Sequence, residues 1–202
     1  YDGGTNIYID ASSVVMSGLV TISGVDDDVN IASGQYGSIA DKNVGTGKTV
    51  TITSTYTGND VGNYSITDQP STTVNITQRP VRLSASKIYD GTTSLGAGTI
   101  TIDTGVSSDD LGYSSATASS MDVSGNKYVD SITLVDGSTG LASNFTTPDL
   151  TTYSATKNSV TITAKPLTIS GLSSSDKVFD TTTNATVNGT AVLQSPISAG
   201  SG

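Results

Sequence analysis

Two acidic clusters are the candidate metal ligands in this sequence. Asp26, Asp27 and Asp28 form one cluster, and Asp109 and Asp110 form the other. Calcium takes several oxygen ligands and tolerates irregular geometry, so carboxylates gathered in a turn could bind it. The spacing lacks the alternate-position ligands of a calcium loop, however, and both clusters lie where a turn is expected. We therefore predict solvated turns and assign no metal site.

A covalent crosslink is the second candidate chemistry, with Lys48, Lys87 and Lys127 as donors to an Asn or Asp side chain. An isopeptide bond of this kind would suit a protein under load. It needs a buried carboxylate beside the reacting pair, and the sequence singles none out. An intact mass lower by one ammonia or one water per domain would reveal such a bond.

Catalysis is the third candidate, and Tyr89 and Asp90 are the residues to which a proton transfer could be assigned. A general acid or base needs a proton partner within hydrogen-bond distance. The chain has no His and no Cys, and all 18 of its acidic residues are Asp, so only Asp pairs or a Ser-Lys arrangement remain. We predict that the protein is not an enzyme, with no catalytic residue, no cofactor-binding residue and no cofactor.

Tyr89 and Asp90 belong to a motif that recurs. Lys-Ile-Tyr-Asp-Gly-Thr-Thr occupies residues 87–93, and near copies occupy residues 1–5 and 177–183. From Tyr1 to Tyr89 the spacing is 88 residues, and from Tyr89 to Phe179 it is 90. That is the size of a small domain. The polar and apolar alternation followed by Asp-Gly predicts a short strand that enters a tight turn.

These motifs, together with Asp-Lys-Asn-Val-Gly-Thr-Gly-Lys at residues 41–48 and Ile-Thr-Ala-Lys-Pro-Leu-Thr-Ile at residues 162–169, resemble the YDG and MBG-type tandem repeats of large bacterial surface proteins, the filamentous-haemagglutinin-like exported adhesins. The resemblance implies a bacterial cell-surface or extracellular location, and it transfers no active site. The chain departs from the pattern at Phe179 and Thr181, and at residues 121–127.

The composition predicts an all-β fold. The chain has no Glu and little Leu and is rich in Ser and Thr, so good helix formers are scarce and strand and turn formers abound. Asp60, Gly62 and Tyr64 have the spacing of a tyrosine corner, which favours tandem immunoglobulin-like β-sandwich domains arranged end to end. Asn144 and Phe145 fall at the corresponding place without the hydroxyl. The alternative is a β-grasp-like sheet.

Three repeats are predicted from the motif spacing. Residues 1–80 form the first and lack its leading strand, residues 81–166 form a complete second, and residues 167–202 supply the opening strands of a truncated third. Proline cannot donate to a strand ladder, so Pro80 and Pro166 mark the boundaries. Strand-like alternation resumes directly after each proline, which predicts almost no linker.

Two hairpins are predicted from local turn signals. Ser17-Gly18 would connect strands at residues 13–16 and 19–22, and Asn188-Gly189 would connect the two halves of residues 185–192. Residues 48–56 alternate Thr with apolar side chains and predict a strand with one buried face.

The net charge of −9 is spread over single Asp residues, which argues against nucleic acid as a partner. No apolar stretch long enough for membrane insertion is visible. We expect as partners neighbouring repeats of the chain, copies of itself in a fibre, or a glycan or host surface protein.

Three functions follow as hypotheses. The first is a structural stalk or shaft module of an exported adhesin or extracellular filament, which provides length and rigidity. The second is a glycan- or host-protein-binding module that uses loops at residues 34–37 or 58–60. The third is a subunit of a head-to-tail fibre, in which a strand from one copy completes the next.

Overall fold

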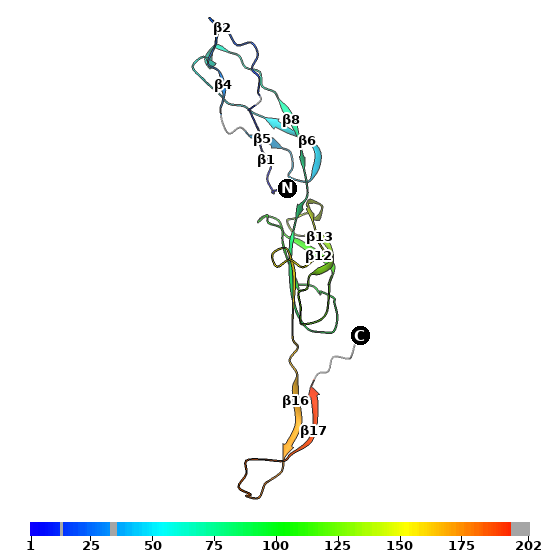
Figure 1. Ribbon diagram of the computed structural model, residues 1–202. Helices are drawn as coiled ribbons and strands as arrows, with labels where there is room; N and C mark the ends of the chain where they lie inside the picture. The colour runs from blue at the N-terminus through cyan, green and yellow to red at the C-terminus, as the bar shows by residue number, and fades with distance from the viewer. Residues whose placement is uncertain (13, 33–35, 195–202) are drawn as a thin grey trace. The chain divides into compact units, whose positions relative to one another are not determined.

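The computed structural model describes residues 1–12, 14–32 and 36–194 (Figure 1). Within these residues the protein is all-β, as predicted, and its two helical segments are single 3-10 turns, η1 (Val61–Asn63) and η2 (Ala142–Asn144). None of the described residues forms a helix long and apolar enough to cross a membrane. The strands are β1 (Asn6–Tyr8), β2 (Thr21–Ile22), β3 (Val25–Asp26), β4 (Asn30–Ile31), β5 (Tyr36–Ile39), β6 (Gly45–Ile52), β7 (Tyr56–Thr57), β8 (Ser71–Ile76), β9 (Arg79–Pro80), β10 (Arg82–Ile88), β11 (Ile100–Asp103), β12 (Leu111–Ala118), β13 (Val129–Asp136), β14 (Phe145–Thr146), β15 (Asn158–Thr163), β16 (Thr168–Ser174) and β17 (Val187–Gln194).

The backbone contacts divide the chain into two compact units. The first contains Tyr1–Val81 together with Asp103–Leu111 and Val135–Thr146. The second contains Arg82–Ile102, Gly112–Leu134 and Thr147–Gly202. Segments of the predicted second repeat therefore belong to the same compact unit as the first. These compact units are not sequence repeats, so the boundaries proposed at residues 80/81 and 166/167 stay predictions.

The main sheet of the first unit has the strand order β1-β5-β6-β8, with antiparallel pairing throughout. Val50 at the centre of β6 has no exposed surface. Among the described residues of the range 1–80, the buried apolar side chains are Val29, Ile39 and Val50. The strand predicted at residues 48–56 forms through Ile52, and β7 begins separately at Tyr56. This first part of the chain thus has a small core.

The second unit has a more extensive core. Its sheet has the order β11-β10-β15, and β10 pairs with β15 in parallel from Leu83 opposite Asn158 to Ile88 opposite Thr163. Leu83 and Ala85 on β10, and Val160 and Ile162 on β15, are all buried. The alternation of buried and exposed positions along both strands is the period of two that a sheet with one covered face requires.

Asn158 is a buried polar side chain that supports this core. Its side-chain oxygen accepts a hydrogen bond from Val129 N at 2.9 Å, and its amide donates to Val129 O at 2.9 Å and to Asp149 O at 3.0 Å. The side chain is 1% exposed, so water cannot replace these bonds. Asn158 thereby holds β13 beside the start of β15.

We expect Asn158→Ala to lower the free energy of unfolding by about 2–3 kcal/mol, because it strands the peptide groups of Val129 away from water. Chemical denaturation measured by circular dichroism checks this value. Asn126→Ala is the matched control, since Asn126 is exposed and its loss should change the stability by less than about 0.5 kcal/mol. Equal effects of the two substitutions would contradict the assignment.

Both predicted hairpins are wrong. The Asn188-Gly189 dipeptide does not reverse the chain but lies within β17, which pairs antiparallel with β16. The register shifts between Ser170 and Leu172, and Gly171 and Gly189 both have positive φ, at 85° and 95°. A Cβ at Gly189 would lie 2.2 Å from Gly171 O. The glycine therefore serves a bulge rather than a turn.

In the first unit the hairpin turn lies at Ser23-Gly24, between β2 and β3, rather than at Ser17-Gly18. Ser23 and Gly24 have φ of 55° and 83°, as a two-residue turn of type I′ requires. Ser13, the first residue of the predicted hairpin, lies outside the described residues. The local signal identified the right region but placed the turn six residues too early.

Tyr64 forms a side-chain bond to the backbone, as the tyrosine-corner prediction requires, but to a distant partner. Its hydroxyl accepts a hydrogen bond from Val20 N at 2.9 Å and donates to Asp27 Oδ2 at 2.7 Å. A tyrosine corner bonds to the backbone only a few residues upstream, whereas Val20 lies 44 residues before Tyr64. The hydroxyl instead fastens the β2–β3 region to the η1 turn.

Candidate functional site

The recurring motif folds into the predicted turn in all three copies. Asp90 Oδ1 accepts a hydrogen bond from Thr92 N at 3.0 Å, and Asp180 Oδ1 accepts one from Thr182 N at 3.0 Å. In the first copy the equivalent bond runs from Gly4 N to the side chain of Asp2, at 2.9 Å. The aspartate of each motif therefore caps its own turn, which is a structural use of a carboxylate.

The motif lysine closes the same turn. Lys87 Nζ donates to Thr92 O at 3.0 Å and to Ser94 O at 2.8 Å, and it lies 2.7 Å from Asp90 Oδ1. The equivalent bonds of Lys177, in the third copy, reach Thr182 O at 2.9 Å, Asn184 O at 2.6 Å and Asp180 Oδ1 at 2.8 Å. The geometry repeats although Thr181 replaces glycine in that copy.

The other two candidate crosslink donors are enclosed by peptide carbonyls. Lys127, which is 2% exposed, donates to Val123 O, Ser124 O and Gly125 O at 2.8–3.1 Å. Lys48 donates to Asp41 O, Asn43 O and Asp41 Oδ1 at 2.6–2.8 Å. The carboxylates that pair with Lys48 and Lys87 are more than half exposed. They do not provide the buried carboxylate that isopeptide chemistry needs.

A polar cluster forms around Asp109, which is buried at 6% exposure. The Tyr1 hydroxyl donates to Asp109 Oδ2, Lys42 Nζ donates to Oδ1 at 2.6 Å, and Ser108 Oγ donates to Oδ1 at 2.9 Å. Tyr1 precedes β1, Lys42 lies between β5 and β6, and Asp109 lies between β11 and β12. We call Tyr1, Lys42, Ser108 and Asp109 the Asp109 cluster.

An aromatic contact extends this cluster. The edge of the Tyr1 ring packs against Phe145, with ring centroids 5.3 Å apart and an interplanar angle of 77°. Phe145 is 3% exposed, and Lys42 Nζ lies 5.9 Å from the centroid of the Tyr1 ring. Phe145 begins β14, which pairs in parallel with β9 at Arg79. The motif tyrosine is therefore held by its ring and by its hydroxyl.

Asn144, the residue before Phe145, makes a second set of polar contacts. Asn144 is 1% exposed, and its side-chain oxygen accepts a hydrogen bond from Val44 N at 2.9 Å while its amide donates to Asn43 Oδ1 at 2.9 Å. Gln78 Nε2 donates to the backbone oxygens of Ser143 and Phe145. The motifs at residues 1–5 and 41–48 therefore both contact the loop that contains Asn144 and Phe145. Sequence reasoning treated them separately.

The pKa shifts in this cluster favour an ionised Asp109, a protonated Lys42 and a neutral Tyr1. Burial raises the pKa of Asp109, but the hydrogen bonds from Lys42, Tyr1 and Ser108 outweigh it and hold the pKa of this carboxyl below its ordinary value of 3.8. Burial, followed by the hydrogen bond to Asp109, raises the pKa of Tyr1 above 10.0. The hydrogen bond to Asp109, followed by the one to Tyr1, raises the pKa of Lys42 above 10.5.

We expect stability to fall at both ends of the pH range. A lowered folded pKa means that the contribution of Asp109 is present above 3.8 and is lost as the pH falls through the folded value. The raised pKa values of Tyr1 and Lys42 mean that their contributions are lost as the pH rises above 10.0 and 10.5. Denaturation midpoints measured across this range check both losses. Asp109→Asn should show a smaller acid loss, and an unchanged acid loss would contradict the assignment.

Three other residues of the two acidic clusters, Asp27, Asp28 and Asp110, hold loops in place. Asp110 accepts hydrogen bonds from Thr139 and from the peptide group of Ser138, which hold its pKa well below the ordinary range. Asp28 Oδ2 accepts a hydrogen bond from Asn59 N at 3.0 Å, and Asp27 accepts the bond from Tyr64. In the described part of the chain, no three acidic side chains are gathered as a metal ion would require.

A family model for the YDG domain matches residues 1–74 and 163–199, together more than half of the chain. The first match begins on the Tyr1 motif, and the second includes β16, which precedes the Phe179 copy. Comparison with curated proteins and with solved structures found no significant match.

Proposed function

The chain belongs to the YDG domain family, and we propose that it is a structural stalk module of an exported, filamentous-haemagglutinin-like bacterial adhesin. In this proposal, small immunoglobulin-like β domains follow one another end to end at the bacterial surface. Their function is to supply length and rigidity. The chain carries out no chemical reaction and takes as its main partners the neighbouring repeats.

The Asp109 cluster is the observation that supports this proposal best. Tyr1 belongs to the recurring motif and Lys42 to the run at residues 41–48, and both bind the carboxylate of Asp109, which lies 108 residues after Tyr1 and 67 residues after Lys42. Asp109 has three donors on its two oxygens and little exposed surface, so a substrate would have to displace them. A motif used in this way is suited to joining repeats and to resisting force between them.

Small-angle X-ray scattering tests the proposal. We expect an elongated particle for the intact chain, because nearly absent linkers leave little freedom between repeats. Asp109→Ala should broaden the distribution of interatomic distances, since it removes the carboxylate that holds Tyr1 and Lys42. A compact profile for the intact protein would contradict a stalk.

A second candidate function, glycan binding, is favoured by a pair of exposed tyrosines. Tyr8 and Tyr36 lie opposite each other on β1 and β5, with ring centroids 5.9 Å apart, and are 66% and 60% exposed. Exposed aromatic side chains carry a large apolar face together with a hydroxyl and are frequent in binding surfaces. Gly34 and Gln35 of the predicted binding loop lie outside the described residues.

A glycan array distinguishes the two functions. Binding that is retained by Tyr153→Ala but lost in Tyr36→Ala would favour recognition through this pair, because Tyr153 is also exposed, at 40%, but lies in the second unit. Absence of binding across a broad array would leave the stalk as the better account.

A further inference from the structure

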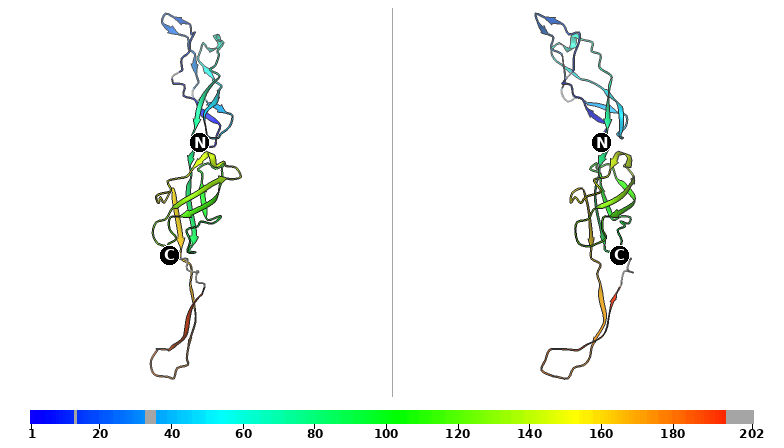
Figure 2. Two further views of the ribbon diagram at one scale, coloured as in Figure 1. Left: turned by 90° about the vertical axis from the view of Figure 1, so that its right-hand side faces the viewer. Right: turned by 45° about the vertical axis from the view of Figure 1, so that its right-hand side comes forward.

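Tyr8 and Tyr36 form a cross-strand pair on β1 and β5, the blue strands next to the N-terminus in both views of Figure 2. The two residues lie directly opposite each other in the antiparallel register, and their ring centroids are 5.9 Å apart at an interplanar angle of 77°. In the described part of the chain this is the one contact between two tyrosine rings. Opposite residues of an antiparallel pair keep their Cβ atoms about 4.5–5.5 Å apart, so the backbone holds the two rings close together.

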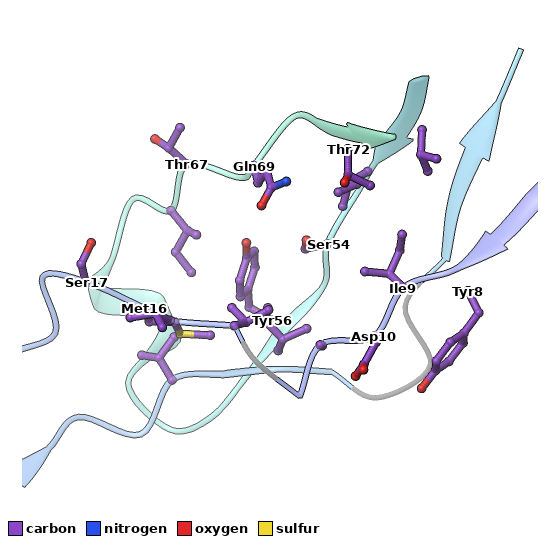
Figure 3. A pocket seen from close by; sticks show the side chains of 18 of the residues that line it. Tyr8, Ile9, Asp10, Met16, Ser17, Ser54, Tyr56, Thr67, Gln69 and Thr72 are labelled. Atoms are coloured by element: carbon purple, nitrogen blue, oxygen red, sulfur yellow. The ribbon is translucent and has the colours of Figure 1, made fainter. Parts of the chain in front are cut away.

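Both rings are accessible from the solvent, since Tyr8 is 66% exposed and Tyr36 is 60% exposed. Figure 3 shows Ile9 directed toward the middle of a hollow of about 990 Å³ and Tyr8 at the edge of that hollow. Exposed side chains change rotamer within picoseconds to nanoseconds. The two rings can therefore leave the edge-to-face arrangement and bring their ortho carbons, the ring carbons beside each hydroxyl, into contact.

The hydroxyls of this pair differ from those of the tyrosines that hold the fold together. Four other tyrosine hydroxyls donate to a carboxylate or a peptide oxygen within the fold, namely those of Tyr1, Tyr56, Tyr64 and Tyr113. A phenol loses its hydroxyl hydrogen when it is oxidised, and in these four residues that loss would break a bond of the fold. Among the described residues no such bond involves the hydroxyl of Tyr8 or Tyr36. Oxidation of this pair therefore leaves the hydrogen bonds of the described fold intact.

A covalent bond at this place would strengthen a pairing that has little other support. Strands β1 and β5 pair over three residues. Among the described residues of the range 1–80, the buried apolar side chains are Val29, Ile39 and Val50. The chain contains no Cys, so a disulfide cannot join the two strands. A bond between the two rings would hold β1 on the sheet where a small core and hydrogen bonds alone now hold it.

We propose that Tyr8 and Tyr36 are the site of an oxidative crosslink, a dityrosine that joins β1 to β5. The oxidant is hydrogen peroxide acting through a haem peroxidase. Each phenol gives up one electron and its hydroxyl proton, and the two radicals couple through their ortho carbons. The ring hydrogens that the new carbon–carbon bond displaces return as protons to the two oxygens. One hydrogen peroxide takes up the two electrons and two protons and leaves as two waters, so the protein loses two hydrogen atoms. The inference depends neither on a role as a stalk nor on glycan binding.

Mass spectrometry of the folded chain, treated with a haem peroxidase and hydrogen peroxide, tests the site. The first Lys or Arg of the chain is Lys42, so trypsin releases both tyrosines in the one peptide 1–42. We expect this peptide to be lighter by two hydrogen atoms and to show dityrosine fluorescence. The yield per molecule should be the same in dilute and in concentrated protein, because both rings belong to one chain.

Two variants serve as the matched pair for this test. Tyr36→Phe keeps an exposed ring, so it should leave the circular dichroism spectrum unaltered, but it should abolish the crosslinked peptide. Tyr153→Phe removes a tyrosine that is 40% exposed and lies outside the pair, and it should leave the yield unchanged. A loss of two hydrogens that persists in Tyr36→Phe, or that appears only in crosslinked dimers, would overturn the proposal.

Urea denaturation of the purified crosslinked monomer measures what the bond does for the fold. A covalent bond between distant residues stabilises a protein mainly by restricting its unfolded chain. We therefore expect the ratio of unfolded to folded molecules at a given urea concentration to fall by at least about tenfold. Tyr36→Phe given the same oxidative treatment should show no such change. Identical denaturation curves for the crosslinked and the untreated protein would overturn the role of the bond in holding β1.

Discussion

Asp109→Ala is expected to lower the free energy of unfolding by about 3 kcal/mol. The carboxylate is 6% exposed and accepts hydrogen bonds from Tyr1, Lys42 and Ser108. Its removal leaves a hydroxyl and an ammonium group without their acceptor in a partly buried site. Deleting one partner of such a pair costs more than the pair itself contributes, because the remaining groups lose their acceptor while water reaches them only in part, as the 31% exposure of the Lys42 side chain shows.

Urea denaturation followed by circular dichroism measures this loss. Asp176→Ala is the control, because Asp176 is exposed and its substitution should change the stability by less than about 0.5 kcal/mol. Asp109→Asn keeps the shape and one acceptor oxygen, so its effect should fall between the two. A loss for Asp109→Ala no larger than that for Asp176→Ala would mean that the cluster does not hold the unit together.

Phe145→Ala is expected to cost about 3–5 kcal/mol, the range for deleting a buried aromatic side chain. Phe145 is 3% exposed, carries the edge contact of the Tyr1 ring and begins the strand that pairs with β9. Its removal leaves a cavity at the place where residues 1–5, the β9 segment and the η2 loop meet. The loss should exceed that of any single hydrogen-bond deletion in the same unit.

Phe179→Ala is a closely matched control for this prediction. The two residues are the only phenylalanines of the chain, and Phe179 is 88% exposed within the third motif copy. Its substitution should change the free energy of unfolding by less than about 0.5 kcal/mol. Thermal denaturation of both variants measures the difference, and similar midpoints would contradict the burial of Phe145 as the source of the loss.

Short-range features of the fold were predictable from the sequence. The lack of Glu and the wealth of Ser and Thr predict an all-β protein, and the Asp90 motif predicts the turn that the structure contains. Such features depend on neighbouring residues. The Asn-Gly signal failed at residues 188 and 189 because the same positive φ that suits a turn also suits a bulge, and pairing with β16 decides between them.

The Asp109 cluster could not be predicted because Lys42 and Tyr1 lie 67 and 108 residues before Asp109 in the sequence. The Asp109-Asp110 pair looked like one feature, yet Asp109 is buried against Tyr1 while Asp110 fastens the loop at Ser138. The two neighbouring aspartates therefore differ in burial, and the local sequence does not predict which of them is buried. The Asn-aromatic pair at Asn144 and Phe145 was the one available signal, since it marked that loop as a counterpart of the Tyr64 region.

A double-mutant cycle between Tyr1 and Asp109 tests the central claim most directly. Tyr1→Phe removes the hydroxyl and Asp109→Ala removes its acceptor, and the free energy of unfolding is measured for each variant and for the double variant. If the motif tyrosine stabilises the unit through Asp109, the coupling energy should exceed about 1 kcal/mol. Additive effects, with a coupling energy near zero, would show that the two side chains act independently and would contradict the account.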